Sequence, residues 1–462
     1  MFKPTVAIVG GGAAGILTAV NLILKSTPLD IFVVNSGSNF GTGVAYNPPT
    51  DSHLLNVMTK KMSAFSDEPE HFVDWIVDSG MFPELEKEIL GITYLPRTIY
   101  GNYLRWIWES SKQKGHPETK VTEVIDRAVN ITLKPKGDFE VHLLNGKTIA
   151  AHFVILATGN SLPRKPPIPN MSFYNSANYI NNPWGNLNAV QVDKDILIIG
   201  NGLTMVDVVQ TLVEKGLKGT IHSISPHGFG ILQHQHHGIK YEGLMKDLIN
   251  DISLSELVSL LNKHIKKVGR LGLSAELVID SLRPRAQGIW QSLSFDEKRK
   301  FMSRLRHLWG VARHRLPIQI YDFMQRLKIE GRLKIWAGSL RNIVEHDENV
   351  IAQIHDSKSG QDRSLNVSLI INCTGPEVDI ERIDDHLFAN LLESGMISPH
   401  PLKLGLNVDP DSLLVVNKDN FTIDSFYAIG GLLRGVLWES TAIPEIRVQA
   451  KAIADRITQI EN

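Results

Sequence analysis

The 462-residue sequence contains a single cysteine, Cys373. One thiol cannot form an internal disulfide, a redox-active CxxC pair or a zinc site built on thiolates. The disulfide reductases that work through an active-site dithiol are therefore excluded. So little cysteine is also typical of a reducing compartment, and we expect a cytoplasmic protein.

The sequence has no excess of charge of either sign, since 48 Lys and Arg residues face 49 Asp and Glu residues. This balance excludes a chain that is basic throughout and coats nucleic acid, and also an acidic disordered chain. Residues 263–334 nevertheless hold 17 Lys and Arg against six Asp and Glu. Such a segment either attracts an anionic substrate or cofactor phosphates, or forms solvated helix faces, which is the commoner outcome for charge runs.

Long hydrophobic runs are scarce as well. Residues 5–24 are almost wholly apolar, but Gly10–Gly12 interrupt them and no clean small-residue cleavage site is present. They predict a buried strand and helix rather than a signal peptide. No other segment reaches the roughly 18 apolar residues that span a bilayer. We expect a small-molecule substrate, no nucleic acid and no membrane span, and the oligomeric state stays open.

Two strand–glycine–helix units occur along the chain, at Val6–Leu24 and Ile196–Leu212. Each is followed much later by an apolar strand that ends in a Thr-Gly turn, Val154–Gly159 and Leu369–Gly375. This echo predicts an α/β fold with two Rossmann-like dinucleotide-binding domains.

The order of these units predicts that one domain is inserted in the other. The first domain is expected to comprise residues 1–162 plus 365–462, and the second residues 163–364, entered through a proline-rich linker. Within the second domain, the pattern turns helical between about residues 239 and 335. We therefore expect a helical insertion there.

Two helix starts in this insertion carry a capping-box pattern, in which a serine is followed three positions later by glutamate. The pairs are Ser253 with Glu256 and Ser294 with Glu297. The second helix is expected to carry apolar residues from Phe301 to Trp309.

The first glycine motif has the spacing G-x-G-x-x-G at Gly10, Gly12 and Gly15. The first glycine permits the tight turn, the second lets the backbone approach a pyrophosphate, and the third lets helix and strand pack closely. The helix N-terminus then offers N–H groups to the phosphates. The next strand ends in Asn35 instead of an acidic residue, so we expect a weaker, uncharged contact to the ribose hydroxyls.

The second glycine motif is less complete. Gly200 and Gly202 are present, but Met205 stands at the third glycine position. After the next strand the chain offers Ser225 and His227, without the arginine that usually binds the 2′-phosphate of NADP. Nicotinamide binding is expected here, with NADH weakly favoured over NADPH.

Ordered sequence blocks run through nearly the whole chain. They are Gly41–Tyr46, His53–Val57, Asp67–Trp75, Pro96–Leu104, Leu282–Pro284, Arg313–Arg315, Asn372–Gly375 and Trp438–Arg447. In these blocks the sequence resembles a bacterial family of FAD/NAD(P)-binding proteins related to the N-hydroxylating and Baeyer–Villiger-type flavin monooxygenases. The resemblance implies FAD in the first site and NADH or NADPH in the second.

The motifs and the resemblance together predict the residues that bind cofactors. For FAD they are Gly10, Gly12, Ala13, Ala14, Gly15, Asn35, Ser36, Thr42, Gly43, Thr158, Gly159, Gly430, Gly431, Glu439 and Thr441. For the nicotinamide coenzyme they are Gly200, Gly202, Leu203, Thr204, Ser225, His227 and Gly375. Many relatives carry aspartate at position 431, where it contacts the ribitol, so this contact is expected from elsewhere. The family also usually has proline at position 58, where this chain has Met58.

Four further residues are candidates for catalysis or substrate binding. His53 and Asn56 either face the flavin or are hydrogen-bonded structural residues. Arg313 and Arg315 either clamp a carboxylate or phosphate of the substrate or pack against acidic helices. The tract His234–His237 has no supporting carboxylate or thiolate at a convincing ligand spacing, so no metal site is predicted.

These patterns predict an FAD-dependent oxidoreductase that uses NAD(P)H. A monooxygenase that hydroxylates a small amino or anionic substrate is favoured. One alternative is a reductase that passes electrons to another acceptor, or an oxidase that releases peroxide. The other is a non-catalytic flavin- or nucleotide-binding protein, which the irregular second motif around Met205 and Pro226 supports.

Overall fold

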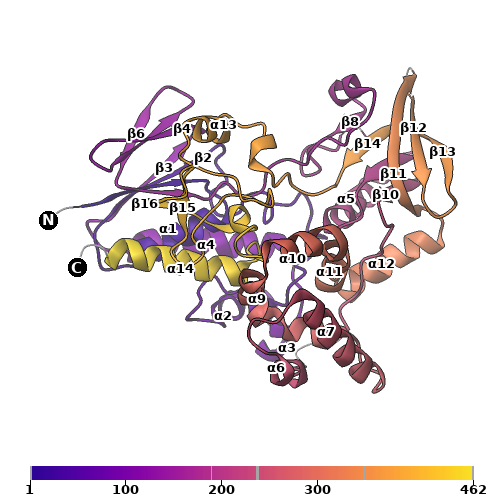
Figure 1. Ribbon diagram of the computed structural model, residues 1–462, viewed down its shortest axis with the longest axis horizontal. Coiled ribbons are helices and arrows are strands. Elements are labelled where there is room, and N and C mark those ends of the chain that lie inside the picture. Colours follow the sequence, from indigo (N-terminus) through magenta and orange to yellow (C-terminus); the bar gives the residue numbers. More distant parts are fainter. Residues whose placement is uncertain (1–2, 189, 236–238, 347–348, 460–462) are drawn as a thin grey trace.

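The computed structural model describes residues 3–188, 190–235, 239–346 and 349–459 (Figure 1). Its first sheet has six strands in the order β15-β16-β7-β1-β2-β3. All neighbours pair in parallel except β15, which runs antiparallel to β16. The strands are β1 (Thr5–Val9), β2 (Asp30–Asn35), β3 (Lys120–Ile125), β7 (Phe153–Leu156), β15 (Leu414–Val416) and β16 (Thr422–Ala428).

Helices cover one face of this sheet and a small antiparallel sheet covers the other (Figure 1). The strands β1 and β7 are buried almost throughout, which explains their unbroken apolar sequences. The helices are α1 (Ala13–Ile23), α4 (Arg97–Lys114) and α14 (Ile443–Gln459). Above the other face lie β4 (Ala128–Leu133), β5 (Phe139–Leu143), β6 (Thr148–Ala151) and α13 (His386–Glu393). Smaller elements are η1 (Thr59–Lys61), α2 (His71–Asp78) and α3 (Lys87–Ile92). We call this assembly the first unit.

The second sheet has seven strands in the order β13-β12-β11-β10-β9-β14-β8. These are β8 (Tyr179–Ile180), β9 (Ile196–Ile199), β10 (Ile221–Ser225), β11 (Leu333–His346), β12 (Asn349–Asp356), β13 (Gln361–Val367) and β14 (Leu369–Asn372). Helices α5 (Leu203–Glu214) and α12 (Ile318–Ile329) share one hydrophobic core with this sheet. The sheet and these two helices form the second unit.

Two connections join the units and run side by side. Pro163 and Pro376 form an antiparallel bridge, and the N–H of Glu377 donates to the carbonyl of Leu162 at 3.1 Å. The second sheet continues past the expected boundary at residue 364, which lies within β13. Because β14 pairs in parallel with β9, the returning connection begins only after Asn372.

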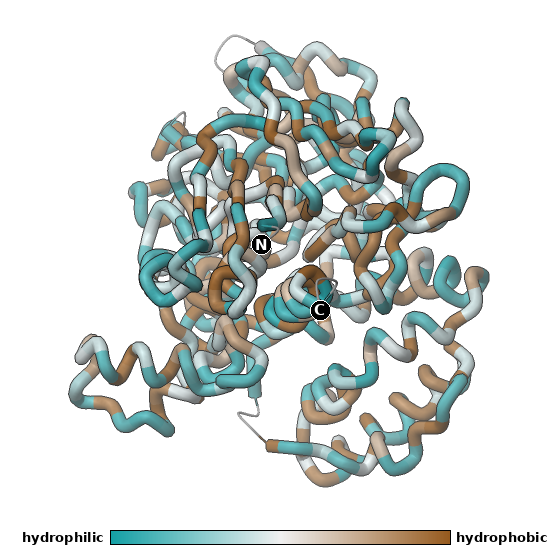
Figure 2. The backbone as a smooth tube through the Cα atoms, turned by 90° about the vertical axis from the view of Figure 1, so that its left-hand side faces the viewer, coloured by the Kyte–Doolittle hydropathy of each residue, from teal (hydrophilic) through white to brown (hydrophobic). Residues whose placement is uncertain are grey.

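The helices that precede α12 between β10 and β11 form a lobe of their own (Figure 2). This helical lobe comprises α6 (Gly243–Asp247), α7 (Leu254–Gly269), α8 (Glu276–Ser281), η3 (Arg283–Arg285), α9 (Ala286–Ser292), α10 (Phe295–Lys300), the π-helical turn η4 (Phe301–Leu305) and α11 (Arg306–Arg313). Both predicted capping boxes are confirmed, at the starts of α7 and α10. The lobe ends earlier than residue 335, because the buried side chains of α12 pack into the second unit.

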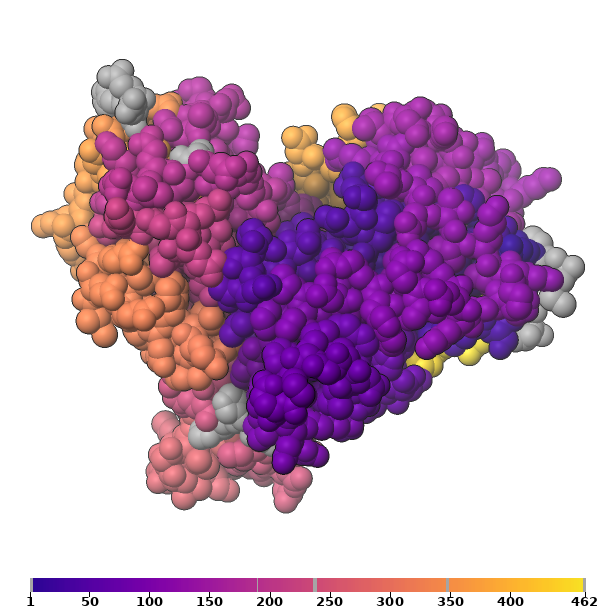
Figure 3. Space-filling view, turned by 180° about the vertical axis from the view of Figure 1, so that it is seen from behind, coloured from indigo at the N-terminus to yellow at the C-terminus, as the bar shows by residue number. Residues whose placement is uncertain are grey.

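The surface is hollowed between the two units, as Figure 3 shows from behind. The carboxyl ends of parallel strands are where open α/β sheets bind ligands. Among the helices in the described ranges, none is both long and apolar enough to cross a membrane.

Candidate functional site

The first glycine loop lies where β1 enters α1. Gly10 has φ +119°, and a Cβ there would lie 2.1 Å from the carbonyl oxygen of Ala157. A Cβ on Gly15 would lie 1.9 Å from the oxygen of Gly10. Backbone packing thus requires both glycines. Around Gly12, by contrast, a Cβ would meet only the Cα of Gly43, at 3.7 Å, so the open space there is available to a ligand.

Asn35 at the end of β2 stabilises this loop. Its Oδ1 accepts a hydrogen bond from the N–H of Gly11 at 3.2 Å, and its Nδ2 donates to the carbonyl of Gly37 at 2.7 Å. An aspartate there would lack the second donor. Thr42 is buried beside this loop, and its Oγ1 has no hydrogen-bond partner within the described residues. A buried hydroxyl without a partner has lost its hydrogen bonds to water and gained none in return. A phosphate oxygen of a ligand would supply the missing hydrogen bond.

The turns that follow β7 and β16 complete the edge of the first sheet. Gly159 and Gly430 have φ values of +73° and +76°. The N–H of Gly430 donates to Gln449 Oε1 at 3.0 Å, and its carbonyl accepts from Ser440, so this turn is bound to the α14 segment. A Cβ on Gly431 would lie 3.0 Å from Oδ1 of Asn160.

Asn160 is therefore the polar residue next to the position where relatives carry aspartate, and the sequence alone did not identify it. Gly12, Thr42 and the two glycine turns together fit a dinucleotide such as FAD at this edge.

The second glycine loop repeats this design in part. Gly200 has φ +109°, and a Cβ would lie 2.2 Å from the carbonyl oxygen of Cys373, whereas Gly202 faces open space. Met205 is buried in the core of the second unit, so this loop accommodates a side chain where the first loop has Gly15. Cys373 is buried, and burial raises the pKa of its thiol, which makes it a poor nucleophile.

A group of basic side chains lies beyond the end of β10, and we call it the cationic cluster after its two arginines. It consists of His227, Arg306, His307 and Arg434. The rings of His227 and His307 have centroids 5.1 Å apart, and Arg306 NH2 lies 3.3 Å from His307 Nε2. Burial lowers the pKa of Arg434, and the charge of Arg306 lowers it further.

Within the described residues, no carboxylate forms an ion pair with any member of the cationic cluster. His227 lies just after β10, Arg306 and His307 belong to the helical lobe, and Arg434 follows the turn that begins at Gly430. Of these four residues only His227 could be predicted from the sequence, because the other three lie far from it along the chain.

A second ligand-sized space of about 140 Å³, which we call the polar cavity, lies between the start of α14, the loop around Asn56 and the helical lobe. Five candidates from the sequence line it: Asn56, proposed for catalysis, Arg313 and Arg315, proposed for substrate binding, and Glu439 and Thr441, proposed for FAD binding. The lining also includes residues outside the predicted site set: Val57, Met58, Lys61, Tyr94, His234, Glu276, Asp280, Arg283, His314, Ala442 and Glu445.

Both predicted substrate arginines are already paired with carboxylates. Arg313 binds Glu439 through Nε at 2.9 Å and NH2 at 3.0 Å. Arg315 NH1 donates to Glu276 and Asp280, each at 3.0 Å. Burial raises the pKa of Glu439, but the hydrogen bonds and the charge of Arg313 outweigh it and hold this pKa below its usual value.

Two buried polar atoms on lining residues lack a partner in the described part of the chain. They are NH2 of Arg315 and Oε2 of Glu445. The other oxygen of Glu445 accepts from Arg283 at 2.7 and 3.0 Å. The polar cavity thus combines an unfilled donor with an unfilled acceptor. Arg283 and Glu445 lie within two blocks of the family resemblance, which was the sequence signal for them.

His53 lies elsewhere. It is buried, and its Nε2 contacts the carbonyl of Asp207 and the hydroxyl of Thr211, both at 2.9 Å on α5. The structure therefore places it between the two units, outside the lining of the polar cavity.

His234 lies in the polar cavity, where its Nδ1 contacts Glu276 at 2.9 Å. The remaining histidines of the tract, His236 and His237, lie outside the described residues.

A six-stranded and a seven-stranded sheet with glycine loops at their carboxyl edges define a flavoprotein fold with two dinucleotide-binding domains. Residues 7–161 match the model of a family described as FAD-NAD(P)-binding, which confirms this part of the resemblance. The comparison with curated proteins finds no match.

Solved structures of the same fold cover the whole chain. The ornithine N-hydroxylase of Kutzneria sp. 744 has a TM-score of 0.69 at 13% identity, with 100% of both chains covered. L-lysine 6-monooxygenase of Pseudomonas syringae has a TM-score of 0.66 at 15% identity, again with 100% of both covered. Bacillithiol disulfide reductase of Staphylococcus aureus has 0.58 at 13% identity, with 100% of both covered. The predicted α/β fold with two Rossmann-like units is confirmed.

Proposed function

We propose that this chain is an FAD-dependent, NAD(P)H-consuming monooxygenase that hydroxylates the nitrogen of a small amine carrying an anionic group. The observation that carries the proposal is the polar cavity, whose lining includes the unfilled acceptor of Glu445 and the unfilled donor of Arg315. An ammonium and a carboxylate on one small molecule would satisfy both. The fold shared with ornithine and lysine hydroxylases supports this choice.

FAD supplies the redox chemistry when bound, because it accepts hydride from the nicotinamide and passes electrons to oxygen. Gly12 and Thr42 would hold its pyrophosphate, and Asn160 is placed to contact its ribitol. The N-terminus of α14 begins next to the polar cavity, and its dipole favours negative charge on a neighbouring group. Arg313 keeps Glu439 ionised there, so Glu439 offers a hydrogen-bond acceptor rather than a proton.

The cationic cluster supports NADPH as the coenzyme. His227 follows the strand after the second glycine loop, which is where dinucleotide folds recognise the 2′ position of the ribose. Arg306 of the helical lobe adds a positive charge at this position that no described carboxylate neutralises, while burial and the charge of Arg306 lower the pKa of His307. We therefore propose NADPH instead of the NADH that the sequence weakly favoured, because the helical lobe supplies an arginine.

A second candidate is an NAD(P)H:acceptor reductase, because a bacillithiol disulfide reductase shares the fold. Cys373 is buried with a raised pKa, so electrons would have to pass directly from the flavin to the acceptor.

The test is anaerobic mixing of the FAD-loaded protein with NADPH or NADH, followed by admission of ¹⁸O₂ with lysine, ornithine or cadaverine. We expect flavin bleaching with NADPH and an ¹⁸O-labelled hydroxylamine from an amino acid, with less from cadaverine, which has no carboxylate. Stoichiometric peroxide with every amine would select the second candidate. Protein that takes up no FAD, or bound FAD that neither coenzyme reduces, would refute an enzymatic function.

A further inference from the structure

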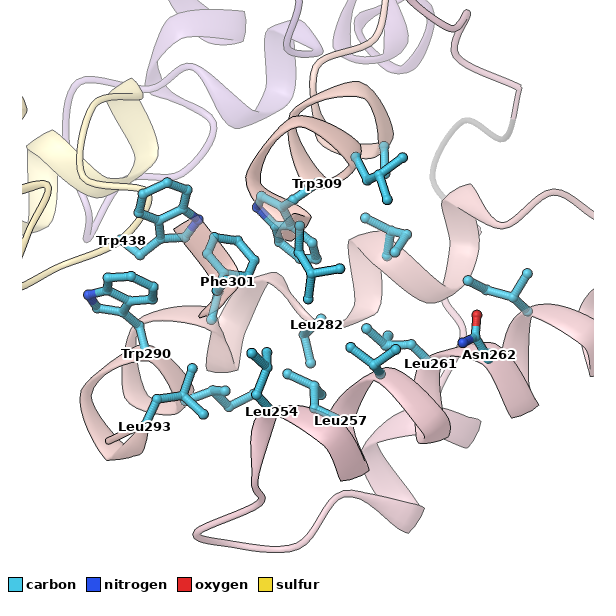
Figure 4. Close-up of a pocket in the computed structure, with 18 residues that line it drawn as sticks. Leu254, Leu257, Leu261, Asn262, Leu282, Trp290, Leu293, Phe301, Trp309 and Trp438 are labelled. Atoms are coloured by element: carbon cyan, nitrogen blue, oxygen red, sulfur yellow. The ribbon is translucent and has the colours of Figure 1, made fainter. Parts of the chain in front are cut away.

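The helical lobe contains an apolar cavity of about 200 Å³ that neither dinucleotide site uses. It lies between α7, α8, α9, the π-helical turn and α11, and Trp438 closes one side (Figure 4). Of its lining residues only Asn262 has a polar side chain other than indole N–H groups. We call this space the apolar cavity.

Rings form one wall of the apolar cavity and leucines form another. Figure 4 shows Trp290, Phe301 and Trp438 gathered at one side, with Leu254 and Leu257 along the edge below. The ring centroids of Trp290 and Trp438 are 5.0 Å apart, and those of Phe301 and Trp438 are 5.2 Å apart in an edge-on arrangement. Contacts of this kind between rings add to the energy of packing, so they help to hold the three rings at this wall.

The π-helical turn Phe301–Leu305 contributes two of the lining side chains. Such turns are rare and occur frequently at functional sites, where they redirect side chains. Here the turn lies directly between α10 and α11 and bounds the apolar cavity on one side.

The polar atoms of the lining narrow the ligand chemistry. Trp290 Nε1 donates to the carbonyl of Gly435 at 2.7 Å, and Trp309 Nε1 donates to Glu439 at 3.0 Å. Trp438 Nε1 is buried and has no partner among the described residues. Apart from this N–H and Asn262, the lining offers no polar group and no opposite charge, so a charged ligand would lose most of its hydration uncompensated, whereas a neutral hydrocarbon would lose nothing.

The apolar and polar cavities share a wall. Neighbouring residues face opposite sides of it: Leu282 lines the apolar cavity and Arg283 the polar cavity, and Trp438 and Glu439 divide in the same way. The indole of Trp309 lines the apolar side while its N–H binds Glu439 on the polar side. The hydrogen bond between Trp309 and Glu439 therefore connects the lining of the apolar cavity to the lining of the polar cavity.

We propose that the helical lobe binds an uncharged hydrocarbon group, slightly larger than benzene, in the apolar cavity. An apolar space of about 150 Å³ is large enough to bind benzene, so the larger space here, which is open at the rim near Leu308, admits a phenyl ring with a short alkyl extension before a longer chain reaches solvent. The group belongs either to the substrate of the proposed reaction or to a separate ligand. The binding site itself stands independently of the proposed function.

The experiment titrates the FAD-loaded protein, without NADPH, with benzene, toluene, ethylbenzene and butylbenzene by calorimetry. We expect affinity to rise about fourfold per added methylene as far as ethylbenzene, and then to stop rising. Benzoate is the charged control and should not bind. Absence of binding by all four hydrocarbons, or equal binding of benzoate, would overturn the proposal.

Variants locate the site. Ala286→Leu fills the apolar cavity from α9 and should weaken ethylbenzene binding at least tenfold, on the order of the methylene groups it displaces. Leu308→Trp does the same from an exposed rim position, so it remains informative should Ala286→Leu fail to fold. Ala150→Leu, on β6 of the first unit, is the matched control and should change nothing. Unchanged affinity in both filling variants would overturn the assignment.

Measurements of NADPH turnover distinguish whether the hydrocarbon group belongs to the substrate or to a separate ligand. If the substrate carries it, phenylalanine, which has an amine, a carboxylate and a phenyl ring, should accelerate NADPH oxidation, and Ala286→Leu should lower kcat/KM for phenylalanine but not for alanine, which lacks the ring. If the ligand is separate, ethylbenzene binds while phenylalanine gives no acceleration. Both results support the site, and only the binding data above can refute it.

Discussion

The ion pair between Arg97 and Asp207 joins the first unit to the second and gives the sharpest prediction. Arg97 NH1 lies 3.0 Å from Asp207 Oδ2, and the two side chains are only 14% and 7% exposed. Arg97 Nε also donates to the carbonyl of Leu54 at 3.2 Å. Arg97 begins α4 and Asp207 lies on α5, so this contact fixes how the two dinucleotide sites face each other.

Replacing Arg97 by methionine leaves the Asp207 carboxylate buried without its counter-ion. Breaking a buried pair in this way costs about 3–5 kcal/mol, whereas replacing both partners by apolar residues is often close to neutral. Arg97→Met should therefore destabilise the protein by about 3–5 kcal/mol, and Arg97→Met with Asp207→Leu by less than Arg97→Met alone.

The loss of stability caused by Arg97→Met should also depend on pH. Burial raises the pKa of Asp207, and Arg97 opposes this, so its removal raises the pKa further. A carboxyl whose folded pKa lies above its unfolded value costs no stability below the unfolded pKa, and the cost grows as the pH rises. The deficit of Arg97→Met should be larger at about pH 8 than at about pH 5.

Urea unfolding followed by circular dichroism, on wild type, both single variants and the double variant, measures these quantities. A cost below about 1 kcal/mol for Arg97→Met would refute the reasoning, since that is the value of an exposed pair. A double variant whose cost equals the sum of the single costs would refute it too.

Three further predictions concern ligand sites. Gly10→Ala should abolish FAD retention, measured as flavin absorbance per chain, because the added Cβ would lie 2.1 Å from a carbonyl oxygen at positive φ; full flavin content would contradict this. Arg306→Gln should weaken NADP⁺ binding by about threefold to tenfold in calorimetry and leave NAD⁺ binding unchanged; the range is kept small because Arg306 is exposed to solvent. Arg304→Gln, at an exposed neighbouring position, is the control. Equal losses of affinity for both coenzymes would exclude a contact of Arg306 with the 2′-phosphate. Glu439→Gln should lower the thermal midpoint of unfolding at neutral pH, and the difference from wild type should shrink as the pH falls below about 4. The reason is that the folded-state pKa of Glu439 lies below its unfolded value, so the stability that its carboxylate contributes is lost on protonation. A difference that grows on acidification would contradict this reasoning.

Local rules made several features predictable from the sequence. The glycine loops follow from backbone sterics, because no side chain fits at Gly10 or Gly15. The capping boxes at Ser253 and Ser294 follow from the need to satisfy the first N–H groups of a helix. Dithiol chemistry is excluded by composition alone, because it needs two thiols and the chain has only Cys373.

The candidate site was less predictable, because its members are remote in sequence. Asn56, Arg313 and Glu439, which were candidates from the sequence because they lie in blocks of the resemblance, line one cavity in the structure, and their roles stay predictions. Glu445 lies in the same kind of block, but its unfilled oxygen is a property of packing. His53 is hydrogen-bonded to α5, as the structural alternative for it predicted, and only its three-dimensional neighbours show this.

The sequence by itself therefore determined the two dinucleotide folds, the glycine turns and the absence of a thiol relay, because each depends on composition or on residues a few positions apart. Only the tertiary structure decided which charges are neutralised. It paired Arg313 with Glu439, and it left Arg306 beside His227 without a carboxylate among the described residues. Electrostatic interactions act between groups that are close in space, and the chain brings these together across more than seventy residues of sequence.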